Sequence, residues 1–217
     1  MIRYQVYNAG HPGDTTVELL ARFDRDVASR LPDVVVLLAG SNDMFYPGHM
    51  LELASYRKNL NLLLDRIAAA NSAVILLTAP RFLKYLLIEN FPGTIENPVS
   101  IEDRLNNLNQ TIRQTASERG IPLVDTFSLI DPVDDTIESM VLNPANSNRR
   151  DGMHMTAAGY GAIAKGVYSV LQENYPAART IVCFGNSITY GVYMRGKGTA
   201  ESDALTYPGQ LQKLLNE

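Results

Sequence analysis

The sequence predicts an α/β protein, a three-layer sandwich in which helices cover both faces of a mostly parallel five-stranded sheet. Five short apolar runs, rich in β-branched residues and without a helical period, are separated by stretches with the 3.6-residue period of amphipathic helices. Strands that alternate with helices in this way form parallel sheets. The five predicted strands are residues 4–8, 34–39, 73–78, 122–125 and 180–184.

The first half of the chain gives clear element boundaries. A Gly and Pro loop at residues 9–13 must end the first strand, and Asp14 is placed to cap a helix that runs to Pro32. The run VVVLLA at residues 34–39 is the clearest buried strand, and the polar loop Gly-Ser-Asn-Asp follows it. The first predicted helix buries Val17, Leu20, Ala21, Val27, Ala28 and Leu31, and the second buries Tyr56, Leu60, Leu63, Leu64 and Ile67.

Residues 81–98 are less regular and leave two interpretations open. Their many apolar and aromatic residues form either a flap over a site or one more core helix. Beyond them, Ser100 and Asp103 match a capping box that opens a helix, and Gly120 ends that helix.

The last third of the chain carries two polar clusters at predicted element ends. A long polar connection leads from residue 125 to Arg150 and delivers Asp151-Gly152-Met153-His154 just before a long helix at about residues 156–174. Pro176 breaks this helix, and the strand at residues 180–184 then ends in Gly185-Asn186-Ser187. A serine at the carboxyl end of a parallel strand stands over the crevice where open α/β sheets place their chemistry.

Composition excludes several classes of function. The 217 residues suit a single domain, and a net charge of -4 with 19% charged residues does not resemble a nucleic-acid binder. The single cysteine, Cys183, excludes an internal disulfide, and its place in an apolar strand favours an inert buried thiol. No apolar run is long enough to span a bilayer, so we expect a soluble, cytoplasmic protein.

The polar clusters combine into a hydrolytic site. In a parallel sheet the strand ends share one edge, so loops distant in sequence converge. Ser187 is a weak nucleophile until a base takes its proton; His154 is the candidate base, and Asp151 is placed to bond the far nitrogen of its ring. The backbone N–H groups of Gly13 and Ser187 and the Asn42 side chain are candidate oxyanion donors, each of a kind worth about 3 kcal/mol in known enzymes.

Four blocks of the sequence resemble those of the GDSL family of esterases and lipases, also called SGNH hydrolases. The blocks are FGNSIT from Phe184, NAGHPGDT from Asn8, GSND from Gly40 and DGMHMT from Asp151. The resemblance implies a flavodoxin-like sandwich, a small-molecule ester as substrate, no cofactor, Ser187 as nucleophile, Gly13 and Asn42 as oxyanion donors, and Asp151 with His154 as the base pair. The family's GDS is GNS here, a change that we expect to tune the chemistry without removing it.

The order of the blocks departs from the family. The nucleophile block, which normally lies near the N-terminus, is last, so the sequence resembles a circularly permuted member. Residues 207–215 then correspond to its first helix and residues 4–8 to its next strand, with the join at residues 173–179. Permutation preserves a site because spatial contacts define it. A short join also allows strand exchange within a homo-oligomer, in which one copy supplies Ser187 to another.

The hypothesis is therefore a serine esterase that hydrolyses small or medium acyl esters, with acetyl esters, lysophospholipids and thioesters all open. Two alternatives remain. Residues 191–198, GVYMRGKG, differ by one residue from a phosphate-binding loop and suggest a nucleotide-binding protein. A hydrolase fold retained only for binding or assembly is the other. His11, His49 and Asp43 lie near the site loops, but their spacing fits no zinc pattern, so no metal is expected.

Overall fold

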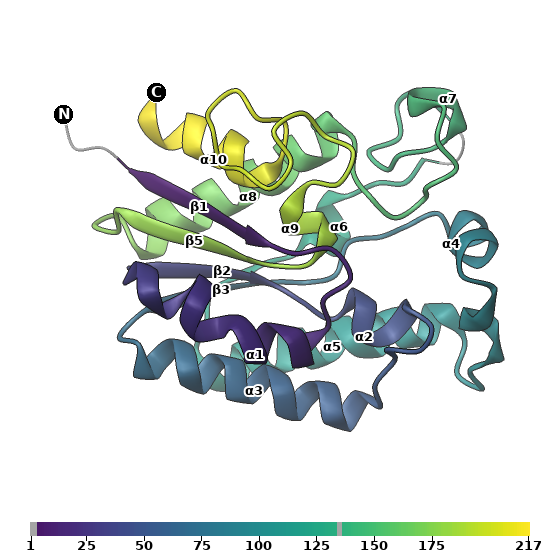
Figure 1. The fold of residues 1–217 in the computed structure, drawn as a ribbon, viewed down its shortest axis with the longest axis horizontal. Helices are drawn as coiled ribbons and strands as arrows, with labels where there is room; N and C mark the ends of the chain where they lie inside the picture. Colours follow the sequence, from purple (N-terminus) through teal and green to yellow (C-terminus); the bar gives the residue numbers. More distant parts are fainter. Residues whose placement is uncertain (1–3, 134–135) are drawn as a thin grey trace.

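A wholly parallel five-stranded sheet forms the centre of the computed structural model, which describes residues 4–133 and 136–217. The strand order is β1-β5-β2-β3-β4, and each neighbouring pair is parallel (Figure 1). The strands are β1 Gln5–Gly10, β2 Val34–Leu38, β3 Ala73–Leu77, β4 Leu123–Val124 and β5 Thr180–Gly185. The predicted fold class and all five strands are confirmed, with boundaries shifted by one or two residues.

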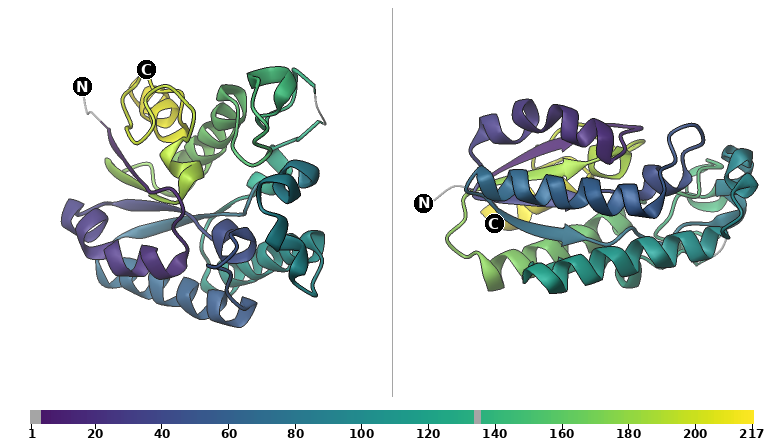
Figure 2. Two further views of the ribbon diagram at one scale, coloured as in Figure 1. Left: turned by 45° about the vertical axis from the view of Figure 1, so that its right-hand side comes forward. Right: turned by 90° about the horizontal axis from the view of Figure 1, so that it is seen from below.

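Helices cover both faces of the sheet, as Figures 1 and 2 show. On one face lie α1 Thr16–Asp26, α3 Leu53–Ala69 and α5 Ile101–Arg119, and on the other lie α8 Ala157–Asn174 and α10 Tyr207–Asn216. The shorter elements are η1 Ala28–Arg30, α2 Ser41–Phe45, α4 Lys84–Asn90, η2 Pro92–Glu96, α6 Thr126–Leu129, α7 Pro144–Ser147 and α9 Ser187–Tyr190. No helix in the described part of the chain combines the length and the apolarity needed to cross a bilayer.

Alternate residues of each central strand supply the two halves of the core. Val182 and Phe184 pack among the side chains of α1, α3 and α5, whereas Ile181 and Cys183 pack towards α8 and α10. Side chains of successive strand residues point to opposite faces, which is why a strand covered on both faces is apolar throughout. Cys183 is fully buried, and this burial raises the pKa of its thiol, as expected for an inert cysteine.

The first helix differs from the prediction at both ends. Thr15, and not Asp14, is the N-cap: its hydroxyl accepts from Val17 N at 3.2 Å, and Glu18 reaches back to Thr15 N at 2.8 Å. Helix α1 ends at Asp26, so the prediction of one helix to Pro32 is wrong. Val17, Ala21 and Leu31 are exposed, contrary to their predicted core positions. The capping box sets the start of α1 and leaves the Asp14 carboxylate free to turn inward.

The segment at residues 81–98 places one face of its helix, α4, in the core, while many of its other residues are exposed. Leu83, Leu86 and Leu87 are buried, and Leu83 N donates to Gly152 O at 2.8 Å. Helix α4 is thereby attached to the turn that carries Asp151 and His154. The segment borders the cavity described below at the end of α4, through Asn90 and Phe91. The interpretation as a core helix therefore describes α4, while Asn90 and Phe91 form part of the cavity wall.

The structure also contains the helix predicted to begin after Ser100. Ser100 accepts from Asp103 N at 3.0 Å as the N-cap of α5, and Gly120 ends this helix in the left-handed conformation. The connection to Arg150 contains the short helices α6 and α7, while its residues 134 and 135 lie outside the described residues.

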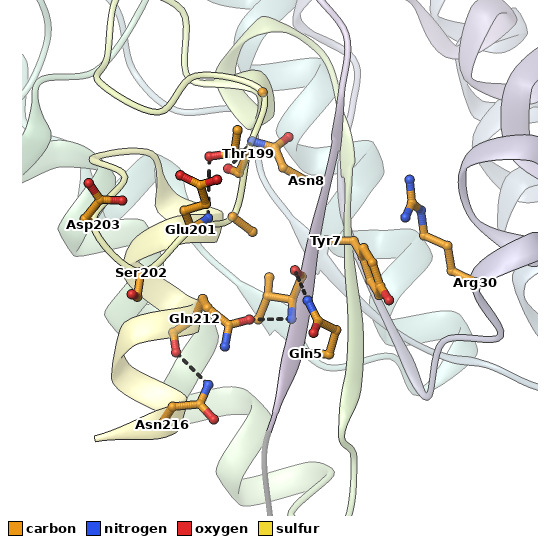
Figure 3. A pocket seen from close by; sticks show the side chains of 13 residues that line it. Gln5, Tyr7, Asn8, Arg30, Thr199, Glu201, Ser202, Asp203, Gln212 and Asn216 are labelled. Carbon is orange, nitrogen blue, oxygen red and sulfur yellow. Dashed lines mark hydrogen bonds between the residues drawn. The ribbon is translucent and has the colours of Figure 1, made fainter.

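The two ends of the described chain meet at the free edge of β1. Tyr4 N donates to Asn216 Oδ1 at 3.0 Å, and Gln212 donates to Tyr4 O at 3.0 Å. Gln212 also accepts from Val6 N at 2.6 Å (Figure 3). The side-chain amides of Gln212 and Asn216 on α10 thus bond to backbone groups at the edge of β1 that a neighbouring strand would otherwise bind. The last strand in the sequence, β5, lies between the first two. A permuted block order requires this arrangement, although permutation itself stays a prediction.

The predicted join between α8 and β5 lies at the opposite end of the strands from Ser187. Asp33 Oδ2 accepts from Arg179 N at 2.7 Å and from Thr180 N at 2.8 Å, which fixes the start of β5. Pro176 and Ala177 between the two elements are exposed. In this structure β5 belongs to the same chain as its neighbours β1 and β2. Strand exchange and oligomerisation stay untested predictions.

A rearranged chain tests whether contacts, and not chain order, define this fold. The rearranged chain consists of residues 177–217, a short glycine-serine linker and residues 1–176, in that order. Its free energy of unfolding should lie within about 1 kcal/mol of that of the natural chain, because closing the new loop costs about as much entropy as closing the loop that is opened. Urea unfolding followed by circular dichroism measures this. A control chain opened between Val35 and Val36 of the buried strand β2 should not fold. Loss of cooperative unfolding in the first chain would refute the idea of a permuted fold.

Candidate active site

A tight turn at the end of β5 presents Ser187. Gly185 is the last strand residue, and a side chain there would collide with Leu38 O and Thr189 Oγ1. Asn186 is buried, and its Oδ1 accepts from Ile188 N at 3.0 Å as the N-cap of α9. An amide oxygen can therefore cap this turn where the related block has an aspartate. Ser187 follows as the first residue of α9.

The Asp151-His154 pair has the geometry expected for a base and the group that orients it. Asp151 Oδ2 lies 2.8 Å from His154 Nδ1, while Asp151 Oδ1 accepts from His154 N at 2.6 Å and from Met153 N at 2.9 Å. Burial raises the pKa of Asp151, but the hydrogen bonds from His154 and the backbone lower it by more, so it lies below its ordinary value. The carboxylate is thus ionised at neutral pH and holds one edge of the imidazole.

Gly152 allows the turn between these two residues to close. Its φ is +78°, a conformation that favours glycine, and an added side chain would collide with Leu86. Its N–H donates to Leu142 O at 2.8 Å. Asn90 Nδ2 also donates to Asp151 O at 3.1 Å, so the turn is fixed on several sides.

The three candidate oxyanion donors come from three different elements. Gly13 has φ +88° in the loop between β1 and α1, and neither its N–H nor that of Ser187 has an acceptor among the turn and loop hydrogen bonds of the described residues. Asn42 is the second residue of α2, and one hydrogen of its Nδ2 is donated to Asp14 O at 2.8 Å. The second hydrogen of this amide has no recorded partner in the described chain.

All five predicted site residues line one cavity of about 370 Å³: Gly13, Asn42, Asp151, His154 and Ser187. The other lining residues are Pro12, Phe45, Tyr46, Asn90, Phe91, Met153, Val192 and Tyr193. No hydrogen bond joins Ser187 to His154 in the described structure. Such bonds are often long in ligand-free sites and shorten when substrate binds.

Sequence reasoning missed a buried arginine beneath this cavity. Arg22 Nε donates to Asp14 Oδ2 at 2.5 Å, Nη1 to Ala9 O at 2.9 Å and Nη2 to Gly185 O at 2.8 Å. Its guanidinium also lies 4.7 Å from the centre of the Phe184 ring. One side chain thus connects the ends of β1 and β5 with the residue that follows Gly13. The available signal was its helical position, because residue 22 falls on the same face as the buried Leu19 and Phe23.

Asp43 is a second buried residue that braces the site. It is fully buried, and its carboxylate accepts from Thr16 N at 3.0 Å and from Thr16 Oγ1 at 2.5 Å. Burial raises its pKa, and the Thr16 hydrogen bonds oppose that effect. Since Asp43 directly follows Asn42, these bonds hold α2 against the start of α1 and orient the Asn42 amide.

Two other groups of residues raised by the sequence lie elsewhere or have other partners. Residues 191–198 form a loop that leads to no helix until α10, so they lack the helix start that a phosphate-binding loop needs. His11 pairs with Asp14 at 2.9 Å, and His49 stacks on Tyr46. Among the described residues no three His, Cys, Asp or Glu side chains are grouped to hold a metal ion.

A larger hollow of about 660 Å³ lies along the free edge of β1 (Figure 3). None of the five predicted site residues borders it. Its wall is polar, and several of its side-chain amides already have hydrogen-bond partners. Asn8 Nδ2, for example, donates to Thr199 O at 3.0 Å. We therefore place the candidate site at the smaller cavity, where the reactive groups converge.

Known proteins match this chain over most of its length. The model of the GDSL-like lipase/acylhydrolase family matches residues 2–162. An acetylxylan esterase of Geobacillus stearothermophilus is 25% identical over 163 residues, which are 74% of this chain and 69% of that protein.

Solved structures show the same fold. A lipase/acylhydrolase from Enterococcus faecalis superposes with a TM-score of 0.56 at 23% identity, over 77% of this chain and 73% of the other. A GDSL-like lipase from Bacteroides thetaiotaomicron gives 0.55 at 23% identity, over 74% and 72%.

Replacing Arg22 tests its role in fixing the site. Arg22→Ala leaves the buried Asp14 carboxylate without its cation, so we expect the free energy of unfolding to fall by about 3–5 kcal/mol, measured by urea denaturation. Arg25→Ala is the matched control: Arg25 is exposed and pairs with Asp26 on the same helix, so its loss should change the free energy of unfolding far less than the loss of Arg22. Equal effects of the two substitutions would contradict this role.

Proposed function

The chain belongs to the GDSL-like lipase/acylhydrolase family and is therefore a carboxylic ester hydrolase; we propose that it cleaves small or medium acyl esters through an acyl-enzyme on Ser187. One observation carries this proposal. The candidate nucleophile, base, orienting carboxylate and oxyanion donors come from four separate segments and line one cavity. Chance placement of five matching groups around one cavity is a poor alternative explanation.

His154 acts as the base in this mechanism. The bond between its Nδ1 and Asp151 favours the tautomer with the proton on Nδ1, which leaves Nε2 able to accept a proton. On substrate binding, Nε2 takes the proton of the Ser187 hydroxyl as the oxygen attacks the ester carbonyl. Asp151 stabilises the imidazolium that results and does not itself take the proton.

Negative charge develops on the carbonyl oxygen during this attack. The N–H groups of Gly13 and Ser187 and the free hydrogen of the Asn42 amide supply three donors for that oxygen. Fixed donors of this kind need no reorganisation during the reaction, which is the source of their effect. His154 then gives its proton to the departing alcohol, and water repeats the sequence to release the acid.

The substrate is best described by its acyl part. Phe45, Tyr46, Phe91 and Met153 give the cavity an apolar region, which suits a short or medium acyl group. The resemblance to an acetylxylan esterase favours an acetyl group on a hydroxylated alcohol such as a sugar over a long fatty acyl chain. A cytoplasmic location remains part of this proposal.

A protein that keeps the fold only for binding is the remaining alternative. It predicts no covalent reaction at Ser187, whereas an esterase predicts labelling of Ser187 by a fluorophosphonate. Nucleotide binding is not favoured, because the loop at residues 191–198 lacks the required helix.

Replacement of the nucleophile is the direct test. Ser187→Ala should lower kcat for p-nitrophenyl acetate at least about 10³-fold, because the acyl-enzyme can no longer form. Ser202→Ala is the control, since Ser202 is exposed and does not border the cavity. Turnover of Ser187→Ala near that of the unaltered protein would place the nucleophile elsewhere.

The dependence of the rate on pH tests the base. Because the pKa of Asp151 is lowered, its carboxylate is ionised throughout pH 5–8, and loss of activity in that range reports on the imidazole. We expect kcat/KM for p-nitrophenyl acetate to fall as the pH is lowered from 8 to 5, since a protonated imidazole cannot accept the Ser187 proton. A value of kcat/KM that does not change between pH 8 and pH 5 would rule out His154 as the base.

A further inference from the structure

Tyr193 stands beside the proposed base in a backbone conformation that its residue type rarely adopts. Its φ is +68°, it is 48% exposed, and its ring lies perpendicular to that of His154 with 5.7 Å between the ring centres. Left-handed backbone costs a non-glycine residue about 1 kcal/mol or more and is often found at functional sites. The conformation therefore needs support from its surroundings.

The loop that carries Tyr193 supplies that support. Val192 N donates to Ser187 O at 3.2 Å, Met194 N to Gly191 O at 3.0 Å and Gly198 N to Tyr190 O at 2.7 Å. The residues on both sides of Tyr193 are thus hydrogen-bonded to helix α9 and its C-cap, Gly191. Its ring has a defined place at the cavity, which it lines together with Val192.

Arg149 lies over this ring. Its guanidinium carbon is 4.3 Å from the centre of the Tyr193 ring, a cation–π distance. Arg149 is exposed, and no carboxylate or carbonyl in the described residues accepts a recorded hydrogen bond from it. The next residue differs, because Arg150 donates from Nε and Nη2 to the two carboxylate oxygens of Glu89 at 2.5 and 2.6 Å. Arg150 is thus paired with the Glu89 carboxylate, whereas Arg149 lies against the Tyr193 ring.

A guanidinium in cation–π contact with a ring still has N–H groups available to a further partner. Two such N–H groups match the two oxygens of a carboxylate or phosphate, and a charge-assisted pair of bonds of this kind is strong. The Tyr193 ring beneath it contacts His154, the residue that returns a proton to the departing alcohol. The alcohol part of an ester, and not its acyl part, is therefore nearest to this pair.

We propose that Arg149 and Tyr193 form a subsite that binds an anionic group, carboxylate or phosphate, on the alcohol part of the substrate. This inference rests on the proposed esterase function and specifies its substrate class. The ester would be that of an acidic sugar or of a phosphorylated alcohol. Tyr193 orients the guanidinium, and Arg149 makes the contact with the anion.

Three acetyl esters with the same acyl group test the subsite. 4-Acetoxybenzoate carries a carboxylate, 4-acetoxyphenyl phosphate carries a phosphate, and methyl 4-acetoxybenzoate is neutral. For the unaltered enzyme, kcat/KM should be higher for at least one anionic ester than for the neutral ester. The difference should come from a lower KM for the anionic ester, because the subsite binds its charged group. The preferred anion distinguishes an acidic sugar from a phosphorylated alcohol as the source.

Substitution of Arg149 should remove this preference. Arg149→Gln should lower the ratio of kcat/KM for the preferred anionic ester to that for the neutral ester about tenfold, as expected for loss of one charge-assisted contact. Arg149→Lys should retain part of the ratio, and Arg149→Glu should invert it. Lys165→Gln is the matched control, because Lys165 is exposed on α8, borders no cavity and carries the same charge. It should leave both activity and ratio unchanged.

The outcomes separate the two proposals. Hydrolysis of the neutral ester without any preference for an anion, or an equal change of the ratio in Arg149→Gln and Lys165→Gln, would overturn the subsite while the esterase function stands. Failure to hydrolyse all three esters, with no labelling of Ser187 by a fluorophosphonate, would overturn the function itself and the subsite with it.

Discussion

The buried contact between Arg22 and Asp14 is the constraint on which the site geometry depends. Gly13 immediately precedes Asp14, and Gly185 lies two residues before Ser187, so a guanidinium that binds both Asp14 and Gly185 O holds the turn at Gly13 and the turn at Ser187 together. The backbone of Asp14 extends this network, because its carbonyl accepts from Asn42. A buried charge costs free energy unless it is paired and hydrogen-bonded, and here Arg22 donates to the carboxylates of Asp14 and Asp26 and to the carbonyls of Ala9 and Gly185.

The parallel sheet explains why so many polar residues are buried at one end of the molecule. All five strands end at the same edge, so the loops after β1, β2 and β5 converge there with their Gly, Asn and Ser residues. Asp43 and Asn186 are buried beside them, yet each bonds a backbone N–H. The opposite ends of the strands carry the connections into them, such as the connection into β5, which Asp33 holds. The stable apolar layers thus support a polar rim whose groups are satisfied or directed into the cavity.

The cavity has regions of different chemistry that come from different parts of the chain. Phe45, Tyr46 and Phe91 belong to the segments after β2 and α4, whereas Tyr193 belongs to the loop after α9. An apolar region suits an acyl group, and the Arg149 guanidinium over the Tyr193 ring would suit a charged alcohol. The same loop after α9 also bonds to β1, because Asn8 Nδ2 donates to Thr199 O, and this bond ties the loop to the sheet.

The sequence by itself determined the fold class, the five strands and the residues of the candidate site, because short apolar runs and polar blocks are local patterns that survive any rearrangement of the chain. It did not determine the helix cap at Thr15 or the inward turn of Asp14, since Thr15 and Asp14 both suit a cap and only the buried Arg22 decides between them. The sequence also could not predict the hydrogen bonds of Arg22 or the cation–π contact between Arg149 and Tyr193. These contacts join residues up to 163 positions apart, and sequence patterns carry no distances between such residues until the sheet has brought them together.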